Sequence, residues 1–137
     1  SGESGEGMGK QGPRTIVLDA GALIAFERAD ARMRALVREA VQLGVRLVVP
    51  AGVIGQVFRD GSRQARLSAL LGGPTSAVAA LDQPLAEACG TLCGRTRTSD
   101  VIDASVVLVA RRERALVLSS DVEDLRRLDS RLPIQRI

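Results

Sequence analysis

A chain of 137 residues that is 45% hydrophobic is long enough to bury the core of one domain without a disulfide framework or a structural metal. It contains no histidine, which excludes imidazole-based catalytic triads and zinc sites of the usual Cys/His kind, and leaves carboxylates, hydroxyls and arginines for any catalysis. The chain has 18 arginines and one lysine against 16 acidic residues, a net charge of +3, and so few aromatic residues that a stacking platform for single-stranded bases is not expected.

The sequence predicts a cytoplasmic protein without a membrane segment. No uncharged apolar run approaches the roughly 20 residues that cross a bilayer, and no signal-peptide pattern is visible. Residues 1–14 are rich in Gly, Ser and Glu and lack apolar periodicity, so we expect a disordered leader, partly left over from cloning, with Met8 as a candidate natural start. Residues 15–137 are expected to form a single domain, in which Cys89 and Cys93 are small buried thiols.

Five short runs of aliphatic or β-branched residues predict buried strands, and longer segments with helical spacing or capping signals separate them. The predicted strands are 15–18, 46–49, 77–81, 115–118 and 134–135. The predicted helices are 20–26, 30–43, 50–58, 63–71, 84–94, 100–112 and 121–128. Strands that alternate with helices predict an α/β fold with a mainly parallel sheet of about five strands and right-handed crossovers.

Four aspartates occupy positions that this topology would bring together. Asp19 and Asp121 each follow a predicted strand, and sites in parallel sheets gather beyond the carboxyl ends of the strands. Asp100 and Asp103 lie three residues apart, at the first turn of the apolar helix that leads into the strand before Asp121. Capping alone would explain this pair, with Asp100 as the N-cap and Asp103 as its reciprocal partner. Convergence of all four acids on one rim of the sheet favours a site with chemistry.

Clustered carboxylates repel one another and raise one another's pKa unless a cation compensates their charge. Oxygen ligands without histidine or cysteine suit Mg²⁺, with Mn²⁺ as a second candidate, and water and a substrate phosphate complete the shell of such an ion. A divalent ion of this kind polarises a phosphate and lowers the pKa of a bound water. Asp19, Asp100, Asp103 and Asp121 are therefore predicted as metal ligands and catalytic residues for hydrolysis of a phosphodiester bond.

Four segments also occur in a specific order and spacing: IVLDAGALI at 16–24, VPAGVIGQV at 49–57, DVIDASVVLVA at 100–110 and VLSSD at 117–121. Together they resemble the motifs of PIN-domain ribonucleases, most closely the VapC-type toxins of bacterial toxin–antitoxin pairs. The resemblance covers residues 15–137. It implies a three-layer α/β/α fold, Mg²⁺-dependent cleavage of RNA, a homodimer, and a cognate antitoxin that inhibits the enzyme.

By position, each of the four aspartates has a counterpart in that family. Asp19 resembles the first acid of the metal site, and Asp103 resembles the acid at the start of the penultimate long helix. Asp121 resembles the acid after the late strand, and Asp100 resembles an additional acid that is common just upstream in this group.

The chain departs from the family in the helix after the second strand, where a Glu is usual and this sequence has Gln56. An amide keeps an oxygen ligand but lacks the charge and cannot act as a base, so metal affinity should fall. Glu27 either supplies the missing carboxylate or is a solvated surface residue. The departure motivates an alternative function, a degenerate PIN domain that binds RNA or a protein partner without cutting.

Other polar residues near the last acid have two interpretations each. Ser119 and Ser120 resemble hydroxyl-bearing residues that orient water or phosphate in the family, or they are simply a strand end and a helix cap. Ser120 and Glu123 fit a capping box, which favours a structural role for Glu123. Asp124 is either an outer ligand of the metal or an acid of the first helical turn.

Two other protein classes with acids at strand ends fit the sequence poorly. A response-regulator receiver needs an adjacent acid pair after the first strand, which is missing, and a lysine, while the chain's one lysine, Lys10, lies in the leader. A haloacid-dehalogenase-like phosphatase would need an Asp at the position of Gly21.

Overall fold

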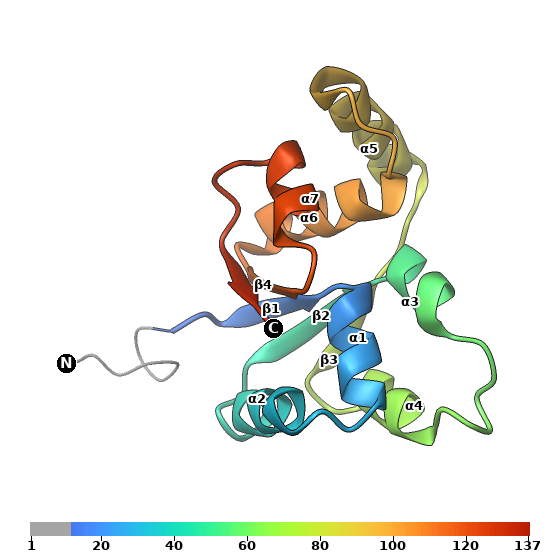
Figure 1. Cartoon of the computed structure of the whole chain (residues 1–137), viewed down its shortest axis with the longest axis vertical. Coiled ribbons are helices and arrows are strands. Elements are labelled where there is room, and N and C mark those ends of the chain that lie inside the picture. Colours follow the sequence, from blue (N-terminus) through green and yellow to red (C-terminus); the bar gives the residue numbers. More distant parts are fainter. Residues whose placement is uncertain (1–11) are drawn as a thin grey trace.

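A computed structural model describes residues 12–137, and the first eleven residues, including Met8 and most of the leader expected to be disordered, lie outside the described part. Five strands form one parallel sheet in the order β3-β2-β1-β4-β5 (Figure 1). The strands are β1 (Thr15–Leu18), β2 (Arg46–Pro50), β3 (Ser76–Ala79), β4 (Leu116–Ser119) and β5 (Ile134–Arg136). The prediction of an α/β fold with a five-stranded parallel sheet is therefore confirmed.

Seven helices connect the strands in the described chain. They are α1 (Ala20–Glu27), α2 (Ala31–Gln42), α3 (Ala51–Val57), α4 (Ala65–Leu71), α5 (Gln83–Thr96), α6 (Val101–Glu113) and α7 (Val122–Leu128). Every predicted element is present. The predicted strand 77–81 is shifted toward the N-terminus, because β3 pairs with β2 in a register that ends at Pro50 opposite Ala79 and leaves later residues without a partner. No helix in residues 12–137 is long and apolar enough to cross a membrane.

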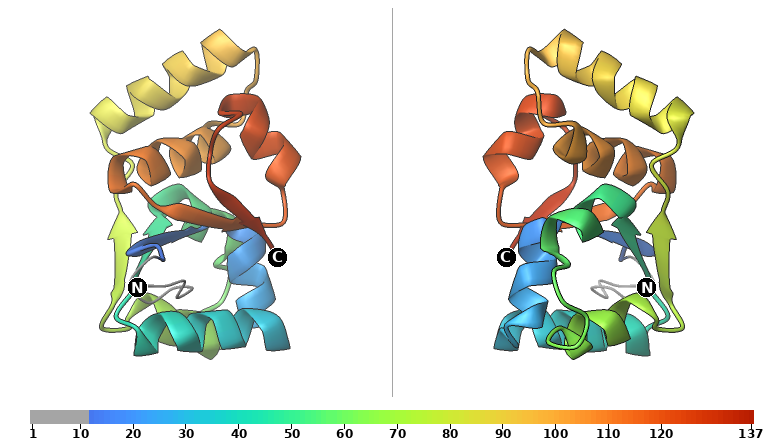
Figure 2. Two further views of the ribbon diagram at one scale, coloured as in Figure 1. Left: turned by 90° about the vertical axis from the view of Figure 1, so that its left-hand side faces the viewer. Right: turned by 90° about the vertical axis from the view of Figure 1, so that its right-hand side faces the viewer.

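The helices form layers on both faces of the sheet, as Figures 1 and 2 show. The connections from β1 to β2 and from β2 to β3 step in one direction across the sheet, whereas those from β3 to β4 and from β4 to β5 step in the other. Since parallel crossovers are right-handed, the two directions place their helices on opposite faces. Helices α1, α2 and α4 cover one face, α6 covers the other with α5 and α7 packed against it, and α3 contacts both α1 and α6.

Helix α6 is the central helix of its layer, packed against β1, β2 and β4 and covered by α5 and α7. Its sequence predicts burial of 106–110, and Val106, Val107, Val109 and Ala110 are at most 1% exposed. Each fully buried aliphatic side chain of this size contributes roughly 1.5–3 kcal/mol to folding. This packing fixes the helix, and with it the acids of its first turn, against the sheet.

Two glycines allow helices to approach the site elements closely. A Cβ at Gly52 of α3 would lie 2.4 Å from Cδ1 of Ile102, the residue before Asp103. A Cβ at Gly21 of α1 would lie 2.1 Å from Oγ of Ser120, which follows β4. A Cβ at either place would displace the end of the Ile102 or Ser120 side chain, so glycine lets α3 approach α6, and α1 approach the β4–α7 turn, without moving those side chains.

Candidate active site

Asp19 and Asp121 follow β1 and β4, two neighbouring strands from which the chain continues toward opposite edges of the sheet. Strands β1 and β4 are neighbours, yet α1 after β1 and α7 after β4 cover opposite faces of the sheet. A crevice beyond the carboxyl ends of two such strands is the usual ligand site of an open parallel sheet. Asp19 is the N-cap of α1 and Asp121 is the N-cap of α7, so the two acids follow directly from the strands that form this crevice.

Asp19 is 4% exposed and its carboxylate oxygen Oδ1 accepts a hydrogen bond from the Ala22 backbone N–H at 2.9 Å. Burial raises the pKa of the Asp19 carboxyl, and the nearby Asp121 charge raises it further. Hydrogen bonds from Ser119 and from backbone N–H groups oppose this shift in pKa. Ser119 is fully buried, and its Oγ also accepts a hydrogen bond from the Asp121 backbone N–H at 2.8 Å. This hydroxyl therefore connects the two acids.

Asp100 and Asp103 form the first turn of α6. The Asp100 side chain caps the helix by accepting a hydrogen bond from the Asp103 backbone N–H at 2.9 Å. Within residues 12–137, the Asp103 side chain makes no reciprocal bond to the backbone of Asp100, so the capping interpretation describes Asp100 and leaves Asp103 unexplained.

The Asp103 carboxyl has the most strongly shifted pKa that the structure resolves. Partial burial, together with the charges of Asp100, Asp121, Asp124 and Asp19, raises its pKa to about 7. Four other carboxylates destabilise the charged form of Asp103, so this residue lies at the centre of the acidic cluster. Strong shifts of this kind are typical of functional sites.

One cavity of about 300 Å³, which we call the acid pocket, collects these groups. It is lined by Asp19, Ala20, Val53, Gln56, Arg59, Asp100, Asp103, Val106, Asp121 and Asp124. All four acids singled out in the sequence therefore line one pocket, together with Asp124 and with Arg59, which the sequence did not single out. Arg59 lies in an irregular segment after α3, where no spacing pattern indicates that its side chain reaches this pocket.

The donor set of the acid pocket suits a hard divalent cation, since five carboxylates and the amide oxygen of Gln56 are all oxygen ligands. Within residues 12–137, no three Asp, Glu or Cys side chains stand close enough together to make a complete metal cluster. The pocket is thus not a cage of protein ligands. A Mg²⁺ bound there would take one or two of the carboxylates and keep several waters.

Gln56 is an exposed residue of α3 that lines the acid pocket, at the place where a Glu was expected from the family pattern. Glu27 does not line this pocket; it lines the neighbouring one, and its Oε1 accepts a hydrogen bond from Nε2 of Gln64 at 3.0 Å. Glu27 is half-buried and has a local partner. In this structure it is therefore a structural side chain of the neighbouring pocket.

Solved structures similar to this chain include several of VapC-type and related toxins. VapBC2 from Rickettsia felis, bound to a DNA fragment from its promoter, matches 90% of this chain and 98% of its own with a TM-score of 0.66 and 10% identity. FitAcB from Neisseria gonorrhoeae matches 87% and 95% with a TM-score of 0.62 and 14% identity. VapC20 from Mycobacterium tuberculosis, a toxin that cleaves the sarcin-ricin loop, matches 80% and 93% with a TM-score of 0.60 and 17% identity. The fold is PIN-like.

At identities of 10–17%, this likeness concerns the PIN-like fold rather than individual residues. No protein-family model matches the chain, and neither does any curated protein sequence. Which residues of the PIN-like fold act chemically must therefore be argued from the acid pocket itself.

The predicted capping box at the start of α7 is wrong. Helix α7 begins after Asp121 with no side-chain cap, and the carboxylate of Glu123 forms an ion pair with Arg136 of β5. Ser120 is exposed, and the Asp121 N–H donates its hydrogen bond to the Oγ of Ser119 instead. The S-x-x-E pattern could not show that β5 returns beside α7 and supplies an arginine for Glu123.

The raised pKa of Asp103 predicts that the metal-free protein loses stability as the pH rises. Between about pH 4 and pH 7 the folded state holds the Asp103 proton and the unfolded state does not, so folding is favoured at the acidic end of this range. The raised pKa of Asp19 acts in the same direction, while the lowered pKa of Asp129 acts only below about pH 4. Thermal midpoints in EDTA should fall from about pH 5 to pH 8. A flat profile would contradict the raised pKa of Asp103.

Proposed function

We propose that this protein is a Mg²⁺-dependent endoribonuclease that hydrolyses RNA phosphodiester bonds, and that it is the toxin of a toxin–antitoxin pair. The observation that carries the proposal is the acid pocket. Asp19, Asp100, Asp103 and Asp121 line it together, beyond the carboxyl ends of β1 and β4 in a PIN-like sheet. The PIN-like fold of VapC toxins supports a nuclease of this type.

In the proposed reaction, each bound Mg²⁺ would take one or two carboxylates from the set Asp19, Asp103, Asp121 and Asp100, and water would complete its shell. A bound Mg²⁺ or Mn²⁺ supplies a Lewis acid for the phosphate and a water of lowered pKa. The buried Ser119 hydroxyl bonds the Asp19 carboxylate and accepts a hydrogen bond from the backbone N–H of Asp121. Arg59, the one basic side chain that lines the acid pocket, is placed to bind a phosphate oxygen.

The proposed partners follow from the same assignment. VapBC2 and FitAB, two structures with this fold, are complexes of a toxin with its antitoxin and DNA, which supports an antitoxin partner for this chain. We also propose a homodimer and a cytoplasmic site of action, as expected of a toxin of this type that cleaves RNA.

A divalent-ion titration of the purified protein tests the proposal directly. We expect saturable Mg²⁺ binding, measured by calorimetry, and cleavage of RNA that rises over the same range of Mg²⁺ concentration and is abolished by EDTA. Because bound carboxylates must be ionised, affinity for Mg²⁺ should increase from about pH 5 to pH 7 as the Asp103 proton is lost. Metal binding without any cleavage would overturn the nuclease assignment.

A degenerate, non-catalytic PIN domain is the second candidate, and Gln56 is the observation that favours it. The side chain lines the acid pocket without the charge that a Glu would bring. In that case the protein would bind RNA or a protein partner and show no metal-dependent cleavage, so the same titration separates the two candidates.

A further inference from the structure

A second pocket adjoins the acid pocket on the side of α1 and α3. It has a volume of about 470 Å³ and is lined by Ile24, Glu27, Arg28, Gln56, Val57, Arg59, Asp60, Arg63 and Gln64. We call it the arginine pocket. It shares Gln56 and Arg59 with the acid pocket, so the two pockets are neighbours and Arg59 lies at their junction.

The floor of the arginine pocket is organised by Gln64, which is 7% exposed. Its Oε1 accepts hydrogen bonds from the backbone N–H groups of Arg59 at 2.7 Å and Asp60 at 3.0 Å. Its Nε2 donates to Oε1 of Glu27 and to the carbonyl of Val57, both at 3.0 Å. One buried amide thus ties the loop 58–64 to the ends of α1 and α3, and every polar atom of that amide has a partner.

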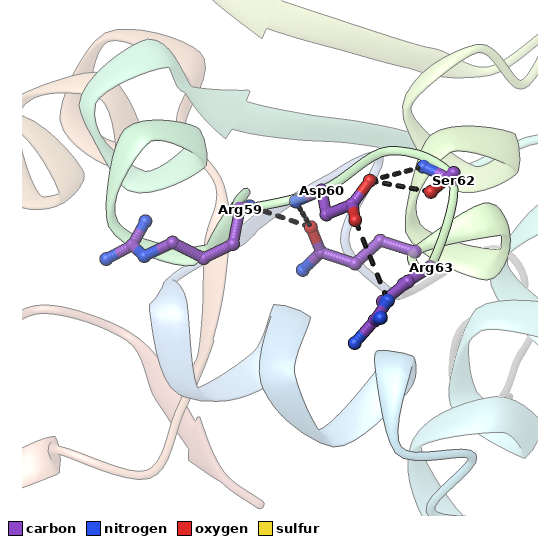
Figure 3. Close-up of polar contacts among 5 residues, drawn as sticks. Arg59, Asp60, Ser62 and Arg63 are labelled. Carbon is purple, nitrogen blue, oxygen red and sulfur yellow. Dashed lines mark hydrogen bonds and ion pairs between the residues drawn. The ribbon is translucent and has the colours of Figure 1, made fainter.

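This loop directs two arginines differently, as Figure 3 shows. Arg59 extends along the end of α3, where its Nη1 donates to the carbonyls of Gly55 at 3.0 Å and Phe58 at 2.8 Å. Arg63 extends from the other side of the loop, with its Nε 3.7 Å from the carboxylate of Asp60. Both contacts use only part of each guanidinium, so each arginine keeps donors for a ligand in the pocket.

The arginine pocket carries more positive than negative side chains, unlike a third pocket that shares Asp100, Asp103 and Asp124 with the acid pocket. Three arginines, Arg28, Arg59 and Arg63, line the arginine pocket against the two carboxylates Glu27 and Asp60. Both carboxylates have partners within it, since Gln64 donates to Glu27 and Arg63 pairs with Asp60.

The pocket on the opposite side of the acids has the reverse balance. It is lined by two arginines, Arg97 and Arg127, against the three carboxylates Asp100, Asp103 and Asp124. Asp124 lies 3.5 Å from Arg127 and neutralises part of its charge. A polyanion that crosses the acid pocket therefore gains more from the side of Arg59 than from this side.

We propose that the arginine pocket binds the RNA phosphate next to the one that is cleaved, and that Gln64 is a positioning residue that holds Arg59 at the junction of the two pockets. Guanidinium groups bind phosphate oxygens through parallel hydrogen bonds and remain charged at every physiological pH. The inference rests on the proposed nuclease function for the identity of its ligand.

Binding of a short fluorescein-labelled single-stranded RNA, measured by anisotropy in EDTA over a series of KCl concentrations, tests the proposal without any cleavage. The double variant Arg59→Ala/Arg63→Ala should bind the RNA about tenfold more weakly. The slope of log K against log salt should fall by about 0.7, the value for one phosphate contact on a single strand. The matched control Arg34→Ala/Arg38→Ala removes two exposed arginines of α2 that line neither pocket, and should bind like the wild type.

Gln64→Met, which keeps the bulk of the side chain and removes its hydrogen bonds, tests the positioning role. We expect it to weaken RNA binding although both arginines remain, and to cause no further loss when added to Arg59→Ala/Arg63→Ala. Additive losses would show that Gln64 acts independently of the arginines and would overturn its positioning role.

The outcomes separate this inference from the proposed function. A protein that cleaves RNA, and whose arginine variant keeps its RNA affinity and salt slope, would overturn the inference and leave the nuclease intact. A protein that loses RNA affinity in the arginine variant but never cleaves would support phosphate binding by the arginine pocket and contradict the nuclease.

Discussion

Replacing Asp103 by Asn is expected to abolish RNA cleavage and at the same time to stabilise the metal-free protein. Loss of groups that only support a metal ligand costs 10–100-fold in affinity or activity, so loss of a ligand should reduce cleavage by at least about 100-fold. The gain in stability follows because an uncharged amide avoids the burial of a charge and the repulsion by neighbouring carboxylates, which together raise the pKa of Asp103 to about 7. Solvent screening of a half-buried group limits this gain to about 1 kcal/mol, or roughly 3–5 °C in the thermal midpoint at this chain length.

The opposite signs make this prediction specific. Replacing a residue that served only the fold would lower stability and activity together. Replacing a metal ligand in a crowded acidic site is expected to lower activity and raise stability. Cleavage assays in Mg²⁺ and thermal melts in EDTA at about pH 8, where Asp103 is ionised, measure the two effects separately. Unchanged cleavage by Asp103→Asn would remove Asp103 from the site.

Asp19→Asn extends the test to the other end of the acid pocket. Asn caps a helix as well as Asp does, so the variant should keep the hydrogen bond to the Ala22 N–H and lose cleavage nonetheless. Asp30→Asn is the matched control, because Asp30 caps α2 in the same way, accepting from the Met33 N–H at 2.8 Å, and lies outside the acid pocket. Equal loss of cleavage in both variants would indicate damage to helix caps rather than to a metal site.

Positions fixed by strand ends could be predicted from the sequence, and positions fixed by irregular backbone could not. Asp19 and Asp121 follow apolar runs whose direction in a parallel sheet is determined, so their meeting at one edge followed from the order of elements. Arg59 and Gln64 lie on a loop whose shape depends on hydrogen bonds from a buried amide to residues on three segments. No periodic pattern encodes such bonds, and Gln64 appears in the sequence as an ordinary polar residue in the first turn of the helix predicted over 63–71.

Local patterns failed where a distant element supplied a better partner. The Ser120 and Glu123 pair has the spacing of a capping box, but Arg136 of β5 pairs with Glu123 and the buried Ser119 hydroxyl bonds the Asp121 N–H. The same limitation applied to Glu27, whose partner Gln64 is 37 residues away in the sequence. In each case the competing contact is made only after the sheet has brought distant segments together.

Replacing Gln56 by Glu is expected to tighten Mg²⁺ binding and to accelerate cleavage. The side chain lines the acid pocket from α3, so a carboxylate there adds a charged oxygen ligand to the pocket that Asp19 and Asp103 also line. Affinity of oxygen-ligand sites is tuned by the number of charged ligands, and we expect an increase of about tenfold, within the range that supporting groups contribute at metal sites. Calorimetric titration with Mg²⁺ and single-turnover cleavage of RNA measure the two effects.

Gln42→Glu is the matched control for this variant, because Gln42 is an exposed residue at the end of α2 and lines neither pocket, so the same change of charge is made far from the acids. Only Gln56→Glu should change the affinity for Mg²⁺, since the field of a surface charge more than about 10 Å away is largely screened at ordinary salt. If the wild-type protein is inactive and Gln56→Glu cleaves RNA, the natural chain has lost its activity through this one residue. If the wild type and Gln56→Glu cleave equally well, the aspartates of the acid pocket hold the metal without a ligand from α3. The missing Glu then has no functional consequence.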